Sequence, residues 1–134
     1  MTQPVVVKNM SFKAGQTLTI TGVANAKATG FAINVGHEKD IALHMNARFD
    51  AHGDQRTVVC NSYQGGKWCE EVRDASFPFQ QGKEFKLLVT FNAKEFQVTL
   101  SDGKVIRFPN RLGDSKYQHL KFEGEARIQG LEVK

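Results

Sequence analysis

Three polar side chains of different chemistry recur at every second position of one short segment: His44, Asn46 and Arg48. Apolar residues stand between and before them, among them Leu43 and Met45. Successive side chains of a β-strand point to opposite faces, so an imidazole, an amide and a guanidinium would stand in one row on one face of a sheet. Such a row offers hydrogen-bond donors and acceptors side by side.

Two later segments would extend this row if their strands lie beside it in the same sheet. Asn61 follows Cys60, which would point to the opposite face, and Glu71 and Arg73 flank Val72. An amide, a carboxylate and a second guanidinium would then join the first three groups.

Trp68, the only tryptophan, would lie beside this polar platform. The hydroxyls of a sugar both donate and accept hydrogen bonds, and charged side chains bind them more strongly than neutral ones. The axial 4-hydroxyl of galactose leaves a continuous C–H patch on one face of the ring, which can lie against an indole. We also expect Glu71 to be held between Arg48 and Arg73, so that these side chains are ordered before a ligand arrives.

The segments around the platform are predicted to be strands. Apolar residues alternate with other residues along 17–21, 31–35, 85–91 and 96–100, and the turn at 101–104 separates two alternating runs, which is a hairpin signal. We expect about ten to twelve short strands and no helix of useful length. The predicted fold is all-β, a jelly-roll sandwich of two antiparallel sheets, with closure into a barrel as the alternative.

The length, composition and net charge of the chain limit the kinds of partner that we expect. The 134 residues, 40% hydrophobic and 24% charged, predict one soluble domain over 1–134. The net charge is +4, but the lysines are scattered, so we expect no nucleic-acid partner. No apolar run approaches the roughly 20 residues that span a bilayer, and no membrane insertion is expected.

The N-terminal residues lack a secretory signal pattern, which predicts synthesis in the cytosol. Because that compartment is reducing, we expect Cys60 and Cys69 to be free thiols, the first buried and the second exposed and reactive.

The polar residues and their spacing resemble the carbohydrate-recognition signature of the galectin family. The resemblance covers the whole chain, extends to 52–54, 59–62, 77–80 and 108–112, and is closest to the proto-type galectins with a single carbohydrate-recognition domain and a concanavalin-like fold. It implies the following carbohydrate-binding residues: His44, Asn46, Arg48, His52, Asp54, Asn61, Trp68, Glu71 and Arg73.

By this resemblance the chain is a lectin and not an enzyme, and it binds β-galactosides such as lactose and N-acetyllactosamine on glycoproteins and glycolipids. His44, Asn46 and Arg48 would bind the galactose 4-hydroxyl, and Trp68 would stack on the ring. Asn61 would bind the 6-hydroxyl.

The same resemblance implies a second set of contacts. Glu71 would share the 6-hydroxyl, and with Arg48 and Arg73 it would also reach the 3-hydroxyl of the next sugar. His52 and Asp54 would lie near the substituent of that second sugar.

Three positions depart from the commonest galectin pattern. Met45 and Ala47 stand where an aromatic residue and a proline are usual, and Cys69 stands where glycine is usual. By the alternation of the strand, Met45 and Ala47 should face away from the sugar. We therefore expect binding to survive, with Cys69 as a position that can alter the loop.

Other chemistries fit the residues less well. His44, His52 and Cys60 lack the paired spacing of a zinc site, so we expect no metal and no cofactor. Glu71 with Asp54 could form the acid and base of a glycosidase, but neighbouring arginines would keep Glu71 ionised, which suits an acceptor and not a proton donor.

The ends of the chain suggest self-association. Apolar residues at 5–7 and Ile128, Leu131 and Val133 could form a homodimer contact through terminal strands, or they could pack inside one sandwich. The resemblance further implies action in the cytoplasm and, after export without a signal peptide, outside the cell. The alternative function is an intracellular module that binds protein partners and has weak or no affinity for sugar.

Overall fold

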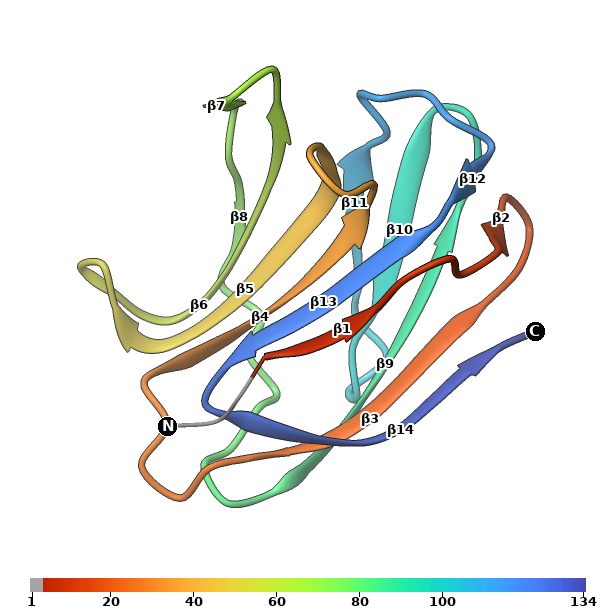
Figure 1. Ribbon diagram of the computed structural model, residues 1–134. Coiled ribbons are helices and arrows are strands. Elements are labelled where there is room, and N and C mark those ends of the chain that lie inside the picture. The colour runs from red at the N-terminus through yellow and green to blue at the C-terminus, as the bar shows by residue number, and fades with distance from the viewer. Residues whose placement is uncertain (1–3) are drawn as a thin grey trace.

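Two antiparallel sheets and a small two-stranded ribbon contain all fourteen strands of the computed structural model, which describes residues 4–134 (Figure 1). Residues 1–3 of the predicted domain lie outside this range. The described residues form no helix, and hence none that is long and apolar enough to cross a membrane.

The larger, seven-stranded sheet carries the polar row. Its order is β1 (Val5–Val7), β13 (His119–Gly124), β4 (Gly30–Gly36), β5 (Ile41–Ala51), β6 (Asp54–Gln64) and β7 (Lys67–Trp68), and β8 (Val72–Asp74) also pairs with β6.

The smaller, five-stranded sheet has the order β11 (Val105–Pro109), β10 (Glu95–Thr99), β9 (Glu84–Phe91), β3 (Leu18–Ala24) and β14 (Ala126–Val133). The ribbon pairs β2 (Phe12–Lys13) with β12 (Lys116–Tyr117). The hairpin predicted around 101–104 joins β10 to β11.

The hydrophobic core lies between the inner faces of the two sheets. Leu43 and Met45 of the larger sheet and Leu87 of the smaller one are fully buried. Phe31 and Phe85 stack across the core, with ring centroids 4.7 Å apart. Burying each such side chain stabilises the fold by about 1.5–3 kcal/mol, so the alternation of apolar residues fixes which face of each strand turns inward.

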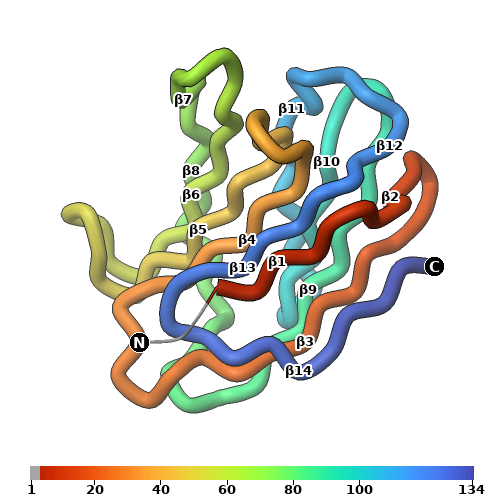
Figure 2. The backbone as a smooth tube through the Cα atoms, viewed as in Figure 1, coloured from red at the N-terminus to blue at the C-terminus, as the bar shows by residue number. Residues whose placement is uncertain are grey.

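The chain passes from one sheet to the other at a tight corner between β13 and β14, which Figure 2 shows as a continuous bend. Gly124 has φ of 97° there, and a β-carbon on it would lie 2.7 Å from the Cα of Phe31. A side chain at this position would therefore clash with backbone as well as strain the residue itself.

The predicted all-β jelly-roll sandwich is confirmed, and the barrel alternative is wrong because each sheet ends in edge strands. The expected number of strands is too low. The shortest strands, β2, β7 and β12, have two residues each, which is too few to produce an alternating pattern. In contrast, β5 and β6 are longer than expected, at 11 residues each.

The core makes a direct prediction about stability. Leu87→Ala should lower the free energy of unfolding by about 2–5 kcal/mol, because it leaves a cavity between the sheets. Val105→Ala, at an exposed position of β11, should cost only about 0.5 kcal/mol. Urea denaturation followed by circular dichroism measures both, and equal losses would contradict the assignment of Leu87 to the core.

Candidate carbohydrate-binding site

The predicted polar row forms on the outer face of the larger sheet. His44, Asn46 and Arg48 project from β5. The apolar residues that alternate with them, Leu43, Met45 and Ala47, are buried on the inner face. His44 pairs in register with Asn34 of β4 on one side and with Asn61 of β6 on the other. The central strand therefore places its polar side chains between those of two neighbours.

The alternation is irregular at the beginning of β5. Register shifts occur there against both β4 and β6, and Ala42 and Leu43 are both fully buried. The first two residues of β5 therefore depart from strict alternation, which holds only from Leu43. The polar row lies beyond the irregularity and is not displaced by it.

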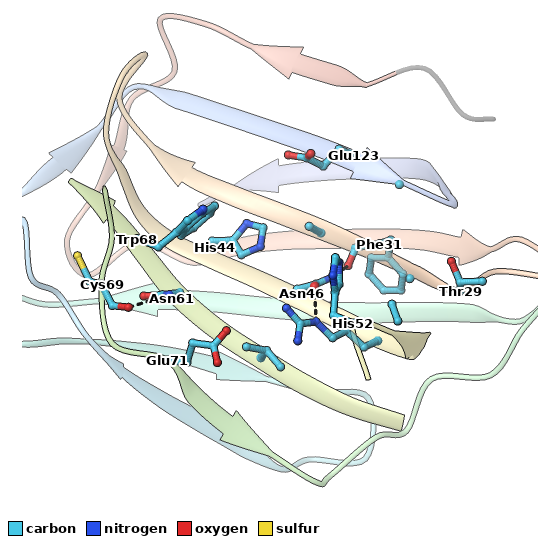
Figure 3. A pocket seen from close by; sticks show the side chains of 16 residues that line it. Thr29, Phe31, His44, Asn46, His52, Asn61, Trp68, Cys69, Glu71 and Glu123 are labelled. Atoms are coloured by element: carbon cyan, nitrogen blue, oxygen red, sulfur yellow. Dashed lines mark hydrogen bonds between the residues drawn. The ribbon is translucent and has the colours of Figure 1, made fainter. Parts of the chain in front are cut away.

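A groove of about 650 Å³ runs over β4, β5 and β6 (Figure 3). It is lined by seven of the nine predicted residues: His44, Asn46, Arg48, His52, Asn61, Trp68 and Glu71. Asp54 and Arg73 do not line the groove, but they contact residues that do. The structure thus brings all nine predicted side chains to one region.

A network of charged hydrogen bonds connects the two arginines. Asp54 accepts from Arg48 through Oδ2 and from Arg73 through Oδ1, each at 2.6 Å. Arg73 also donates to Glu71 at 2.9 Å, and Arg48 Nε donates to the Asn46 side-chain oxygen at 2.7 Å. The hydrogen bonds from Arg73 and then Arg48 lower the pKa of Asp54, which keeps its carboxylate ionised.

This network corrects one expectation. The carboxylate between Arg48 and Arg73 is Asp54, whereas Glu71 is hydrogen-bonded only to Arg73 within residues 4–134. The reason is the tight turn between β5 and β6, which carries Asp54 back beside Arg48. His52 and Gly53 both have positive φ, 53° and 81°, as a two-residue hairpin turn of this kind requires.

His44 is oriented by a chain of hydrogen bonds that passes through Asn34 to Glu123, which also lines the groove. Its Nδ1 lies 2.6 Å from Oδ1 of Asn34, whose Nδ2 donates to Glu123 at 2.9 Å and to the carbonyl of Lys121. Both of these partners only accept, so the amide of Asn34 presents its oxygen to His44. His44 then donates from Nδ1 and keeps Nε2 as an acceptor.

Sequence reasoning missed Asn34 and Glu123 as parts of the site. The available signal for Asn34 was an amide inside the apolar run of β4, where its side chain is only 4% exposed. Glu123 gave no signal, because its contact with Asn34 spans 89 residues of sequence.

Trp68 is 53% exposed, so part of its indole is accessible to a ligand. Tyr63 packs edge-on against the ring with centroids 5.1 Å apart, and His44 lies tilted against it at 4.8 Å. Asn61 donates to the carbonyl of Cys69, which holds the segment after Trp68 against β6. These contacts fix the position of an otherwise exposed aromatic side chain.

The comparisons with known proteins agree with this geometry. The family model described as galactoside-binding lectin matches residues 4–133. The chain belongs to this family of lectins. It is 56% identical over 131 residues to a "Beta-galactoside-binding lectin" of Electrophorus electricus, with 97% of each chain covered.

Solved galectin structures have the same fold. The chain is similar to Dario rerio galectin-1-L2, with 63% identity, a TM-score of 0.95 and coverage of 97% of this chain and 99% of that one. It is also similar to congerin II with lactose and MES bound (37%) and to CG-16, a homodimeric agglutinin from chicken liver (40%). In both of these the TM-score is 0.94, with 98% of this chain and 100% of the other covered.

The departures from the usual galectin pattern can now be placed in this lectin. Met45 and Ala47 are fully buried on the core side of β5, as predicted, and do not face the groove. Cys60 is buried, also as predicted, and desolvation raises the pKa of its thiol to about 12. Both cysteines are free thiols.

The prediction that Cys69 is exposed is wrong, because this residue is half-buried. Its amide donates to the carbonyl of Ser62 and its carbonyl accepts from Asn61, which draws it toward β6. As for a metal, no group of three or more His, Cys, Asp or Glu side chains suited to hold one occurs within residues 4–134.

The environment of His44 predicts a shift in the pKa of its imidazole. Burial lowers its pKa from the usual 6.5, an effect that Glu123 opposes and Arg48 reinforces. An NMR titration should therefore give a midpoint below 6.5, with the neutral ring protonated on Nδ1. A midpoint at or above 6.5, or a proton on Nε2 at neutral pH, would contradict the arrangement. Asn34→Ala removes the acceptor at Nδ1 and should increase the share of the other tautomer.

Proposed function

We propose that this chain is a lectin that binds β-galactosides, including lactose and N-acetyllactosamine, through the groove on the larger sheet, and that residues 1–134 act as one carbohydrate-recognition domain. The observation that carries the proposal is the row of His44, Asn46 and Arg48 beside the partly exposed indole of Trp68 in one groove. The name of the Electrophorus electricus relative and the lactose bound to congerin II support the same ligand class.

The arrangement offers partners to the 4-hydroxyl, the C–H face and the 6-hydroxyl of the first sugar. An axial 4-hydroxyl above β5 would donate to His44 Nε2 and accept from Arg48, while Asn46 is held in place by its bond to the carbonyl of Phe31. The C–H face of the ring would cover Trp68. The 6-hydroxyl would reach Asn61 and Glu71, which lie on the β6 side of the groove (Figure 3).

The second sugar would lie toward β8. There Glu71 and Arg73 are joined by an ion pair, and Arg48 and Arg73 share Asp54. Because these side chains hold one another, a neutral ligand orders few additional rotamers when it binds. His52, in the adjoining turn, would lie near the substituent of this second sugar.

We also propose that the chain is not an enzyme. Asp54 and Glu71, the two carboxylates that could serve a glycosidase, each accept from arginine side chains. A carboxylate held in this way accepts hydrogen bonds and is a poor proton donor. Action both in the cytoplasm and outside the cell stays a prediction.

The substitution Trp68→Ala tests whether the proposed ligand binds against Trp68. Calorimetry should detect saturable binding of N-acetyllactosamine by the wild-type protein, with an affinity between about 1 μM and 1 mM. The variant should lose at least about tenfold in affinity, since it lacks the stacking surface. Cellobiose, which lacks the axial hydroxyl, is the control and should give no heat.

Absence of binding to N-acetyllactosamine by the folded wild-type protein would contradict the lectin proposal. Capture of protein partners that persists in excess lactose would then favour the alternative of a protein-binding module.

We further propose a homodimer through the terminal strands. β1 and β14 are edges of the two sheets, and residues from both strands line one small cavity. Val5 and Val6 of β1 and Leu131 of β14 are exposed, whereas Ile128 and Val133 pack against the core. CG-16, which is described as homodimeric, supports this proposal.

Val5→Asp should shift the protein to monomer in analytical ultracentrifugation, because the substitution places a charge on the exposed edge. Agglutination of cells should fall with it, while affinity for N-acetyllactosamine at one site should persist. Val105→Asp, at the edge strand β11, is the matched control and should leave the dimer intact. A dimer that survives Val5→Asp, or that Val105→Asp also disrupts, would contradict this interface.

A further inference from the structure

Arg56 has a backbone conformation that an arginine rarely adopts. Its φ is 48°, in the left-handed region, although it lies inside β6, two residues after Asp54. The hydroxyl of Thr57 donates to the carbonyl of Gln55 at 2.9 Å, which bridges the backbone on the two sides of Arg56. Holding a residue other than glycine in this region costs free energy, so the surrounding contacts must stabilise it.

The side chain of Arg56 crosses from the hairpin of β5 and β6 to the segment that follows β8. Its Nη2 donates to the carbonyl of Phe77 at 3.0 Å, and its Cζ lies 5.1 Å from the centre of the Phe77 ring. Phe77 is 7% exposed and packs edge-on against Phe49, with ring centroids 5.0 Å apart. Arg56 forms no ion pair within residues 4–134, so Phe77 is the partner of its guanidinium there.

This contact lies beyond the end of the ladder between β6 and β8. The register of the two strands ends at the pair of Val58 and Asp74. Phe77 comes three residues after β8 and belongs to no strand. The guanidinium of Arg56 therefore joins two segments at a point where no backbone hydrogen bond joins residues 54–57 to residues 75–79.

The same two segments carry the two halves of the network beside the second sugar. Asp54 lies two residues before Arg56, and Arg73 lies four residues before Phe77. Asp54 accepts from Arg73 at 2.6 Å, so this ion pair and the contact of Arg56 with Phe77 connect the same parts of the chain. Loss of the second contact would release the hairpin and change the distance over which Asp54 must reach Arg73.

Arg48 depends less on this distance than Arg73 does. The side chain of Arg48 is 12% exposed, and its Nε also donates to Asn46 within β5. The side chain of Arg73 is 46% exposed, and its other partner, Glu71, is 41% exposed. If Asp54 moves, Arg48 therefore remains held, whereas Arg73 gains conformational freedom.

We propose that Arg56 is a positioning residue for the second sugar, because its contact with Phe77 keeps Asp54 in reach of Arg73. Arg56 does not line the groove, so it acts through Asp54 and not on the ligand. The inference rests on the proposed function, in which Arg73 reaches the 3-hydroxyl of the second sugar. Without the contact, Arg73 must be ordered when that sugar binds, which costs about two- to tenfold in affinity.

NMR titrations with methyl β-galactoside and with N-acetyllactosamine test the inference. The quantity to compare is the ratio of the two dissociation constants, monosaccharide over disaccharide. This ratio measures the contribution of the second sugar, and a general loss of affinity cancels in it. Arg56→Leu should lower the ratio by about two- to tenfold. Arg56→Lys keeps a cation that can donate to the carbonyl of Phe77, and it should retain most of the ratio.

Further variants separate this contact from other effects. Arg56→Asn suits the left-handed φ, but its side chain is too short to reach Phe77, so it should lower the ratio as Arg56→Leu does. It also decides the question if Arg56→Leu prevents folding. Arg107→Leu removes an exposed arginine of β11, in the other sheet, and should leave the ratio unchanged. In an Asp54→Asn background, Arg56→Leu should lower the ratio little further, because both residues act through one contact.

The outcomes distinguish the inference from the proposed function. A ratio that Arg56→Asn leaves at the wild-type value, or an effect of Arg56→Leu that is as large in Asp54→Asn as in the wild type, would overturn the role of Arg56 alone. Equal affinity of the wild-type protein for the two sugars would also overturn it, while galactose binding stands. No binding of either sugar by the folded wild-type protein would overturn both.

Discussion

The alternation of side chains along β5 is the constraint on which the site depends. Leu43, Met45 and Ala47 are fully buried between the sheets, and the polar row occupies the positions between and after them. A shift of the strand by one residue would turn Arg48 into the core and expose the apolar side chains. The same burial that stabilises the sandwich therefore fixes the direction of every polar group on the strand.

The direction in which a side chain leaves the strand does not fix the conformation of a long side chain. In the polar row, hydrogen bonds to a second set of residues fix it. Asp54 holds Arg48 and Arg73 together, and Asn34 holds His44. Neither lines the groove, so both act through the residue that they contact. Arginine gains most from such a partner, because its planar donors lose less freedom on binding once they are already oriented.

The sandwich fold and most residues of the site could be predicted from the sequence. The contacts that could not be predicted depend on the three-dimensional structure. Strand alternation predicts the sandwich and the row on β5, because it depends on local spacing. The spacing of Trp68 and Glu71 relative to that row matches a known family, which local pattern alone would not have separated from an ordinary solvated strand face. The predicted partner of Arg48, Glu71, was wrong. The true partner depends on the geometry of one turn, where His52 adopts a positive φ.

Contacts between strands distant in sequence were beyond prediction for a further reason. Asn34 and Glu123 meet because β4 and β13 are neighbours in the larger sheet, and no property of either residue specifies that pairing. Their contact has two effects, since Glu123 orients the amide that orients His44 and also lines the groove. The position of the proton on His44 and one wall of the groove are therefore linked through one carboxylate. A change at β13 can alter both, although that strand lies outside the segment in which the sequence concentrates its recognisable residues.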